Sequence, residues 1–178
     1  MSRQFKNILT ILFFLICIGV INTAGQNIEL EIRGVNAFTF TLIVAVLLQV
    51  IFFIPSFLLK TEKYYDLVGS LTYVTTVSLA YFSVETKTMI DSIIYFYVMV
   101  WALRLGIYLF RRVRNDGKDV RFEKAKRHFF WFLQYWMGQA LWVSLTACAA
   151  IIAILSPEDD ALPLSLIHIS EPTRHLDI

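Results

Sequence analysis

The sequence is poor in charge, glycine and cysteine. Of its 178 residues only 17% are Asp, Glu, Lys or Arg, and it has 7 glycines and 2 cysteines. It contains no glycine-rich dinucleotide motif, phosphate-binding loop or nucleophile elbow, so nothing in it supports the chemistry of the common soluble enzymes. Cys17 and Cys148 stand inside apolar runs without metal-ligating neighbours at useful spacing, which argues against a disulfide or a metal site.

Apolar residues, in contrast, are abundant. They make up 57% of the chain, and the mean hydropathy is +0.63, well above the value typical of a soluble domain. A helix that crosses the hydrocarbon region of a bilayer needs about 20 such residues. The composition therefore predicts an all-α fold, a polytopic transmembrane helix bundle whose main body spans residues 37–160. Five apolar runs are candidate spans: residues 8–23, 38–59, 67–84, 92–110 and 129–155.

The first apolar run has features of both a signal anchor and a signal peptide. Arg3 and Lys6 precede it, and it ends near small residues at positions 23–25. We expect residues 1–36 to form a signal anchor and the first loop, with a cleaved signal peptide as the alternative. Both give the same topology, because cleavage leaves the new amino terminus on the side where the uncleaved first loop lies.

Lys and Arg residues are distributed unevenly between the runs. The amino end and the second loop carry two each, against one each in the first and third loops. By the positive-inside rule, we expect the amino end and residues 60–66 and 111–128 to face the cytoplasm. The basic residues are topological anchors that attract lipid headgroups, or they dock an anionic cofactor; membrane topology explains them without nucleic acid. The fourth loop carries eight of them: Arg111, Arg112, Arg114, Lys118, Arg121, Lys124, Lys126 and Arg127.

The fourth run places an arginine at membrane depth. Arg104 lies two helical turns before Arg111, roughly 10 Å along the axis, where a charge by default marks a function or a buried partner. Because a buried cation needs an anion, we expect Asp66 to pair with Arg104, with Glu62 as the second choice. Helical spacing puts five residues on the same face: Tyr97, Trp101, Arg104, Tyr108 and Arg111.

Two further polar and aromatic stripes follow helical spacing. Packing alone explains such stripes, since hydrogen bonds between spans and aromatic residues near interfaces are routine. If the three stripes converge, they line an amphipathic cavity suited to a lipid-like substrate with one polar end. A tyrosine beside an arginine is able to donate a proton there. The stripes are Asp66, Ser70 and Tyr73 in the third run, and Trp131, Gln134, Tyr135, Gly138, Gln139 and Trp142 in the fifth.

Three motifs carry a family resemblance. They read T-E-K-x-Y-D-L-x-G-S-x-T-Y at residues 61–73, R-L-G-x-Y-L-x-x-R at 104–112 and G-K-D-x-R-F at 117–122. Through them, residues 52–156 resemble a membrane family of unassigned function that is grouped with the steroid 5-alpha-reductases. The resemblance implies an integral membrane oxidoreductase with seven or so spans, of which about five are present here. It also implies NADPH, bound on the cytoplasmic side, as the reductant for an activated carbon-carbon double bond of a steroid or other isoprenoid-like lipid.

Site residues follow from the resemblance. On the substrate side, it suggests Glu62, Asp66, Tyr73 and Arg104 as catalytic residues. Cofactor phosphates would contact Arg112, Lys118 and Arg121, since several cations together are the usual solution for phosphate. An Arg104 side chain that points outward into acyl chains, or emergence of residues 61–73 and 111–122 on opposite leaflets, would lead us to abandon the reductase interpretation. Related folds include isoprenylcysteine carboxyl methyltransferases, so a membrane methyltransferase that uses S-adenosylmethionine is one alternative, and a non-catalytic lipid-binding bundle is another.

The last stretch departs in character from the rest of the chain. Residues 164–174, L-S-L-I-H-I-S-E-P-T-R, resemble the in-frame translation of a sequencing adapter. We therefore expect residues 161–178 to be a non-native tail, with a real tail as the alternative, and exclude its two histidines from any site. The carboxyl-terminal segment that resembles S-R-H-P-N-Y-x-G-E in the family does not occur here. We expect a truncated protein that is inactive by itself.

Overall fold

The protein folds into a bundle of α-helices. A computed structural model describes residues 2–116 and 122–156. A two-stranded hairpin (β1, Glu31–Ile32; β2, Val35–Asn36) and a short 3₁₀ helix (η1, Ala125–Arg127) join the longer elements. All five apolar runs are helical, which confirms the all-α bundle. The helices are α1 (Arg3–Thr23), α2 (Ala37–Leu58), α3 (Tyr65–Ser83), α4 (Met89–Asp116) and α5 (Phe129–Leu155).

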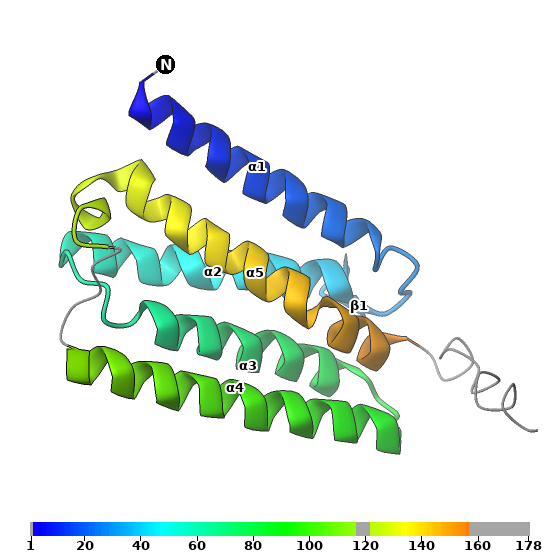
Figure 1. Ribbon diagram of the computed structural model, residues 1–178. Helices are drawn as coiled ribbons and strands as arrows, with labels where there is room; N and C mark the ends of the chain where they lie inside the picture. The colour runs from blue at the N-terminus through cyan, green and yellow to red at the C-terminus, as the bar shows by residue number, and fades with distance from the viewer. Residues whose placement is uncertain (1, 117–121, 157–178) are drawn as a thin grey trace, which may run out of the picture.

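The helices lie side by side, and successive helices run in opposite directions (Figure 1). Helix α5 packs against α1, α2 and α3, whereas α3 packs against α2, α4 and α5. Helices α1 and α4 lie on opposite sides of the bundle (Figure 1). The amino end, the α2–α3 turn and the segment that leads into α5 share one end of the molecule (Figure 1), which we call the basic end.

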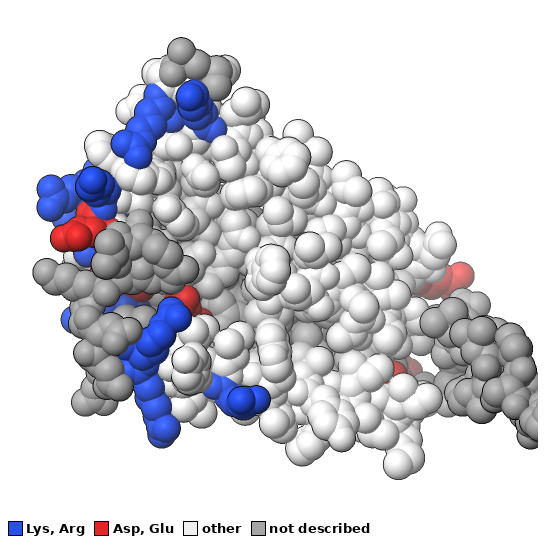
Figure 2. Space-filling model, in the orientation of Figure 1, with Lys and Arg blue, Asp and Glu red and all other residues white. Residues whose placement is uncertain are grey.

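Lys and Arg side chains gather at the basic end, and most of the belt between the two ends is uncharged on the face drawn in Figure 2. Helices α1, α2 and α5, together with residues 89–112 of α4, are long and apolar enough to cross a membrane. Residues 60–66 and the described part of residues 111–128 both lie at the basic end. That this end faces the cytoplasm stays a prediction.

Helix α3 is the one expected span that does not meet this standard of length and apolarity. Its inner face carries hydroxyl groups, and Ser70, Thr72 and Thr76 are all buried. Thr72 accepts a hydrogen bond of 2.9 Å from the buried amide of Gln49 on α2. The lower hydropathy of α3 thus reflects polar contacts with its neighbours, which are a common means of helix association in membranes.

Small residues bring α3 and α4 close together. The Ser70 hydroxyl donates a 2.6 Å hydrogen bond to the main-chain carbonyl of Ala102. A Cβ atom at Gly106 would lie 2.7 Å from the Ser70 Cβ, so only glycine fits there. Gly69 likewise faces Gln139 of α5, whose Cδ would lie 3.0 Å from an added Cβ. The glycines of the first two motifs therefore serve helix packing.

The first loop ties α1 to the rest of the bundle. Asn36 caps α2 by accepting a 3.0 Å hydrogen bond from the main-chain nitrogen of Thr39. Its amide also donates to the carbonyls of Gly25 and Ile28, at 3.1 and 2.6 Å. The Thr39 hydroxyl donates a 2.7 Å bond to the side chain of Asn22, on α1. These contacts fix the loop between the first two helices, since each satisfies a main-chain or amide group.

Candidate functional site

Two ion pairs join the motif at residues 61–73 to the end of α4 and to the segment that leads into α5. Lys126 donates to Glu62 at 2.7 Å, and the two side chains are only 19% and 5% exposed. Arg112 donates to Asp66 at 3.3 Å, with side chains that are 42% and 13% exposed. Both acids of the motif at residues 61–73 thus contact the segments around the fourth loop. Both acids therefore lie at the same end of the bundle as that loop; their location on the cytoplasmic side stays a prediction.

Local backbone structure places these acids. Lys60 adopts a left-handed conformation with φ of 50°, which ends α2 and turns the chain. The main-chain nitrogen of Thr61 then bonds the carbonyl of Ser56 at 2.9 Å. Asp66 falls in the first turn of α3, where a carboxylate is favoured by the helix dipole.

Tyr65 begins α3, next to Asp66 in the chain. Its hydroxyl donates a 2.9 Å hydrogen bond to the main-chain carbonyl of Tyr135 on α5. Its ring packs at 4.8 Å from Phe122 and 5.3 Å from Trp136, both of which are almost fully buried. Tyr65 therefore stands at the inner edge of the charged end, in a cluster that excludes water from one side.

A groove of about 410 Å³ continues from Tyr65 along α5. Most of its wall is apolar or aromatic, and the amides of Gln134 and Gln139 supply polar groups. Within the described part of the chain, the Gln139 Oε1 atom is buried without a hydrogen-bond partner. Most of the predicted α5 stripe lines this groove, which we call the α5 groove. Its lining residues are Phe14, Tyr65, Gln134, Tyr135, Gly138, Gln139 and Trp142.

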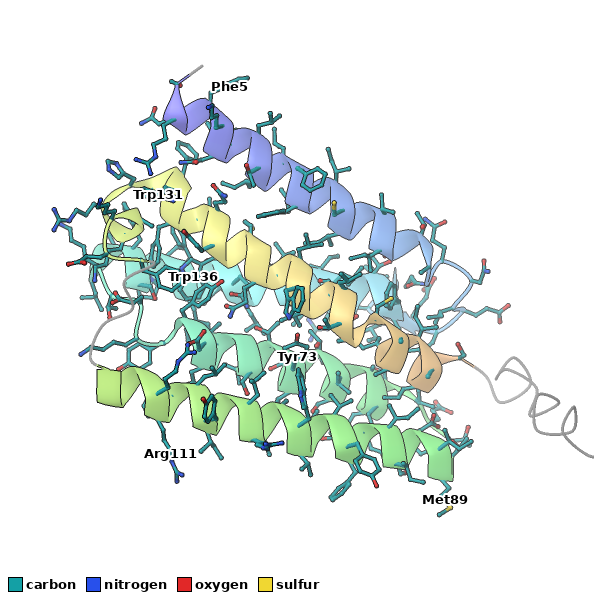
Figure 3. The ribbon with its side chains drawn as sticks, in the orientation of Figure 1. Phe5, Tyr73, Met89, Arg111, Trp131 and Trp136 are labelled. Atoms are coloured by element: carbon teal, nitrogen blue, oxygen red, sulfur yellow. The ribbon has the colours of Figure 1, made fainter. Side chains whose placement is uncertain are left out.

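Tyr73 lies away from the α5 groove, in the bundle core. It is 4% exposed, and its hydroxyl lies 2.6 Å from that of Thr146 on α5. Its ring meets the edge of Trp101 on α4 at 4.9 Å. Figure 3 shows Tyr73 much farther along the bundle than Trp136, which contacts Tyr65. The structure therefore separates Tyr73 from Glu62 and Asp66.

The expected pair of Arg104 with Asp66 does not form, and this prediction was wrong. The Arg104 side chain is exposed, and Asp66 pairs with Arg112 instead. Most of the predicted stripe of α4 faces outward: Tyr97 and Tyr108 are 68% and 64% exposed, and Arg111 points away from the bundle in Figure 3. Trp101 is the exception, since its ring contacts Tyr73 of α3. Helical spacing identified a common face, but that face is the outer one. The three stripes do not converge on a single cavity.

Of the expected cofactor residues, the structure describes the side chain of Arg112 alone, because Lys118 and Arg121 lie outside the described residues. The Arg112 guanidinium is partly exposed beside Asp66, a setting from which it is able to reach a second anion. Within residues 2–116 and 122–156, no group of three His, Cys, Asp or Glu side chains is arranged to hold a metal ion.

Sequence reasoning did not assign Tyr65 or Lys126 to the site. Tyr65 is a fixed position of the first motif, so the motif itself contained that signal. Lys126 was counted as one of eight loop cations, and nothing in its spacing marked it as the buried one. Gln139 was noted as part of a stripe, but its position beside Gly69 depends on helix packing.

The fold and groove define an integral membrane helical bundle with charged groups fixed at one end. The chain belongs to the DUF1295 family of proteins of unknown function, whose model matches residues 52–170. This match confirms the membrane family of unassigned function. Comparison with curated proteins found no match, and neither did comparison with solved structures.

Proposed function

We propose that this chain is part of an integral membrane oxidoreductase related to the steroid 5-alpha-reductases. It would reduce an activated carbon-carbon double bond of a lipid or isoprenoid-like substrate with NADPH. The α5 groove carries the proposal, since a largely apolar channel with amide groups suits a lipid with one polar end. The motif resemblance supplies the reaction type.

Tyr65 is the best-placed proton donor for this reaction. Its phenol belongs to the groove lining, and its O–H, which donates to the carbonyl of Tyr135 at 2.9 Å, would turn from that carbonyl to the substrate to deliver its proton. Saturation of a double bond needs a hydride on one carbon and a proton on the other, and a positioned tyrosine is a suitable acid. Glu62 and Asp66 act as positioning residues, because their ion pairs fix the turn that carries Tyr65.

NADPH would supply the hydride when bound. The described residues fit part of this cofactor: Arg112 has an exposed guanidinium edge at the basic end, and such an edge binds phosphate well. Arg104 is no longer part of the proposed site, because it lies on the opposite face of α4 from the bundle. The proposal therefore places cofactor phosphates near Arg112.

Binding and turnover test the proposal separately. Saturable NADPH binding to membranes that contain this chain should weaken in Arg112→Ala and stay unchanged in the adjacent control Arg111→Ala. Turnover of lipid extracts by the longer parent protein should fall in Gly138→Leu, which fills the groove beside Phe14. Gly19→Leu is the matched control, because nothing lies within 4 Å of a Cβ at that position. Binding of S-adenosylmethionine in place of NADPH would overturn the reductase and favour the methyltransferase.

A non-catalytic lipid-binding bundle is the second candidate. The outward position of Arg104 favours it, because the expected constellation of Arg104, Asp66 and Tyr73 does not assemble. The same groove would then hold a lipid without converting it. This function predicts groove binding that Gly138→Leu abolishes, with binding of neither nucleotide cofactor.

A further inference from the structure

A second cavity opens at the basic end. It has a volume of about 470 Å³ and lies between the start of α1 and the segment that leads into α5. We call it the basic pocket. Its lining residues are Arg3, Glu123, Lys124, Arg127, His128 and Trp131.

The charge of the basic pocket selects for an anion. Three cations, Arg3, Lys124 and Arg127, line the pocket together with one carboxylate, Glu123. Among the described residues, no ion pair within 4 Å joins Glu123 to any of these cations. One carboxylate offsets only part of the charge of three cations, so the pocket keeps a net positive charge.

Arg3 is oriented by an aromatic ring. Its guanidinium carbon lies 3.6 Å from the ring centroid of Trp131, a close cation–π contact. Stacking occupies the flat face of the guanidinium and leaves its N–H groups in the plane, where they match the oxygens of a phosphate. The His128 ring lies 6.0 Å from the same indole at a shallow angle.

The position of the pocket indicates where the anion comes from. Arg3 begins α1 and Trp131 lies in the first turn of α5, so both stand at the ends of apolar helices. Tryptophan and arginine at such ends lie at the level of lipid headgroups. Exposed Phe5, which follows Arg3 on α1, continues from this level toward the apolar belt, where acyl chains would lie.

We propose that the basic pocket binds the phosphate group of an anionic phospholipid. Arg3 and Arg127 donate to phosphate oxygens, and Trp131 packs against the glycerol region. This site is separate from the α5 groove, and it holds whether or not the chain is a reductase. Bound lipid would bridge α1 to the start of α5 at the basic end.

Lipid titration of the detergent-solubilised protein tests this proposal, with affinity measured by native mass spectrometry. Phosphatidylglycerol should bind about tenfold or more tightly than phosphatidylcholine with the same acyl chains. Arg3→Ala with Arg127→Ala should remove most of this preference. The control, Lys60→Ala with Lys63→Ala, removes two exposed cations from the same end and should leave it nearly unchanged.

Two results would overturn the proposal. An equal loss of affinity in the control variant would mean that the general charge of this end attracts the lipid. Displacement of phosphatidylglycerol by an equal concentration of glycerol phosphate would mean that the pocket takes a soluble anion. If circular dichroism shows that the double variant does not fold, the single variant Arg3→Ala tests the lipid preference instead. Its side chain is exposed and lies outside the buried core, so we expect this variant to fold.

Discussion

Replacement of Gly106 by alanine should loosen the contact between α3 and α4. The added Cβ would lie 2.7 Å from the Ser70 Cβ, whereas carbon atoms in contact prefer a separation of about 3.5–4.0 Å. The helices must then move apart by about 1 Å, which also stretches the hydrogen bond from Ser70 to Ala102.

Three energy contributions set the expected loss of stability. Overpacking costs about 1–3 kcal/mol, and a weakened hydrogen bond adds about 1 kcal/mol. Alanine regains about 0.5–1 kcal/mol over glycine inside a helix. We therefore expect Gly106→Ala to lower the free energy of unfolding by about 1–3 kcal/mol, measured by denaturant unfolding in mixed micelles with far-UV circular dichroism.

A second-site substitution distinguishes overpacking from other causes. Ser70→Gly removes the clashing Cβ, so the double variant should be more stable than the sum of the single effects by about 1 kcal/mol or more. Ser70→Ala removes the hydroxyl, which lies closest to the added Cβ, but keeps the Ser70 Cβ at 2.7 Å, so it should rescue less than Ser70→Gly. A Gly106→Ala protein as stable as the unaltered one, or strict additivity with Ser70→Gly, would refute the close contact.

Three further predictions test the charged end, the topology and the groove. Lys126→Ala should destabilise the protein by about 1.5–3 kcal/mol by removing a charge-assisted hydrogen bond to the buried carboxylate of Glu62, and Arg112→Ala, with its more exposed side chain, by about 1 kcal/mol or less; equal losses would contradict the burial difference. In a background without natural cysteines, Arg33→Cys should react with an impermeant maleimide in intact cells and Lys63→Cys only after permeabilisation; the reverse pattern would invert the topology. In the longer parent protein, Tyr65→Phe should lower lipid-dependent NADPH oxidation by about 100-fold or more, with folding retained, and unchanged turnover would exclude Tyr65 as the acid.

The helices were predictable because the bilayer imposes a simple length rule. Each apolar run of the sequence is a helix, and the α5 run was predicted with the observed limits, residues 129 and 155. The end of α4 was not: it continues beyond residue 110 through Arg111 and Arg112. Long basic side chains at a membrane boundary are compatible with helix, so hydropathy marks the end of the span and not the end of the helix.

The orientation of α4 was not predictable from periodicity. In a soluble protein, the polar face of a helix points outward, but in a membrane both the bundle interior and the lipid are apolar. Tyr97, Arg104 and Tyr108 were correctly placed on one face, yet nothing in their spacing states which side that face takes. Because Arg104 lies on the outer face of α4, Asp66 pairs with Arg112 and not with Arg104.

The place of α1 has a consequence for any processing of the chain. Phe14 forms one wall of the α5 groove, and Arg3 stacks on Trp131 in the basic pocket. A protease that cut after Thr23 and released the preceding segment would open both cavities at once, exposing the outer face of α5. Retention of that segment would then be a condition for ligand capture, and not only for insertion into the membrane.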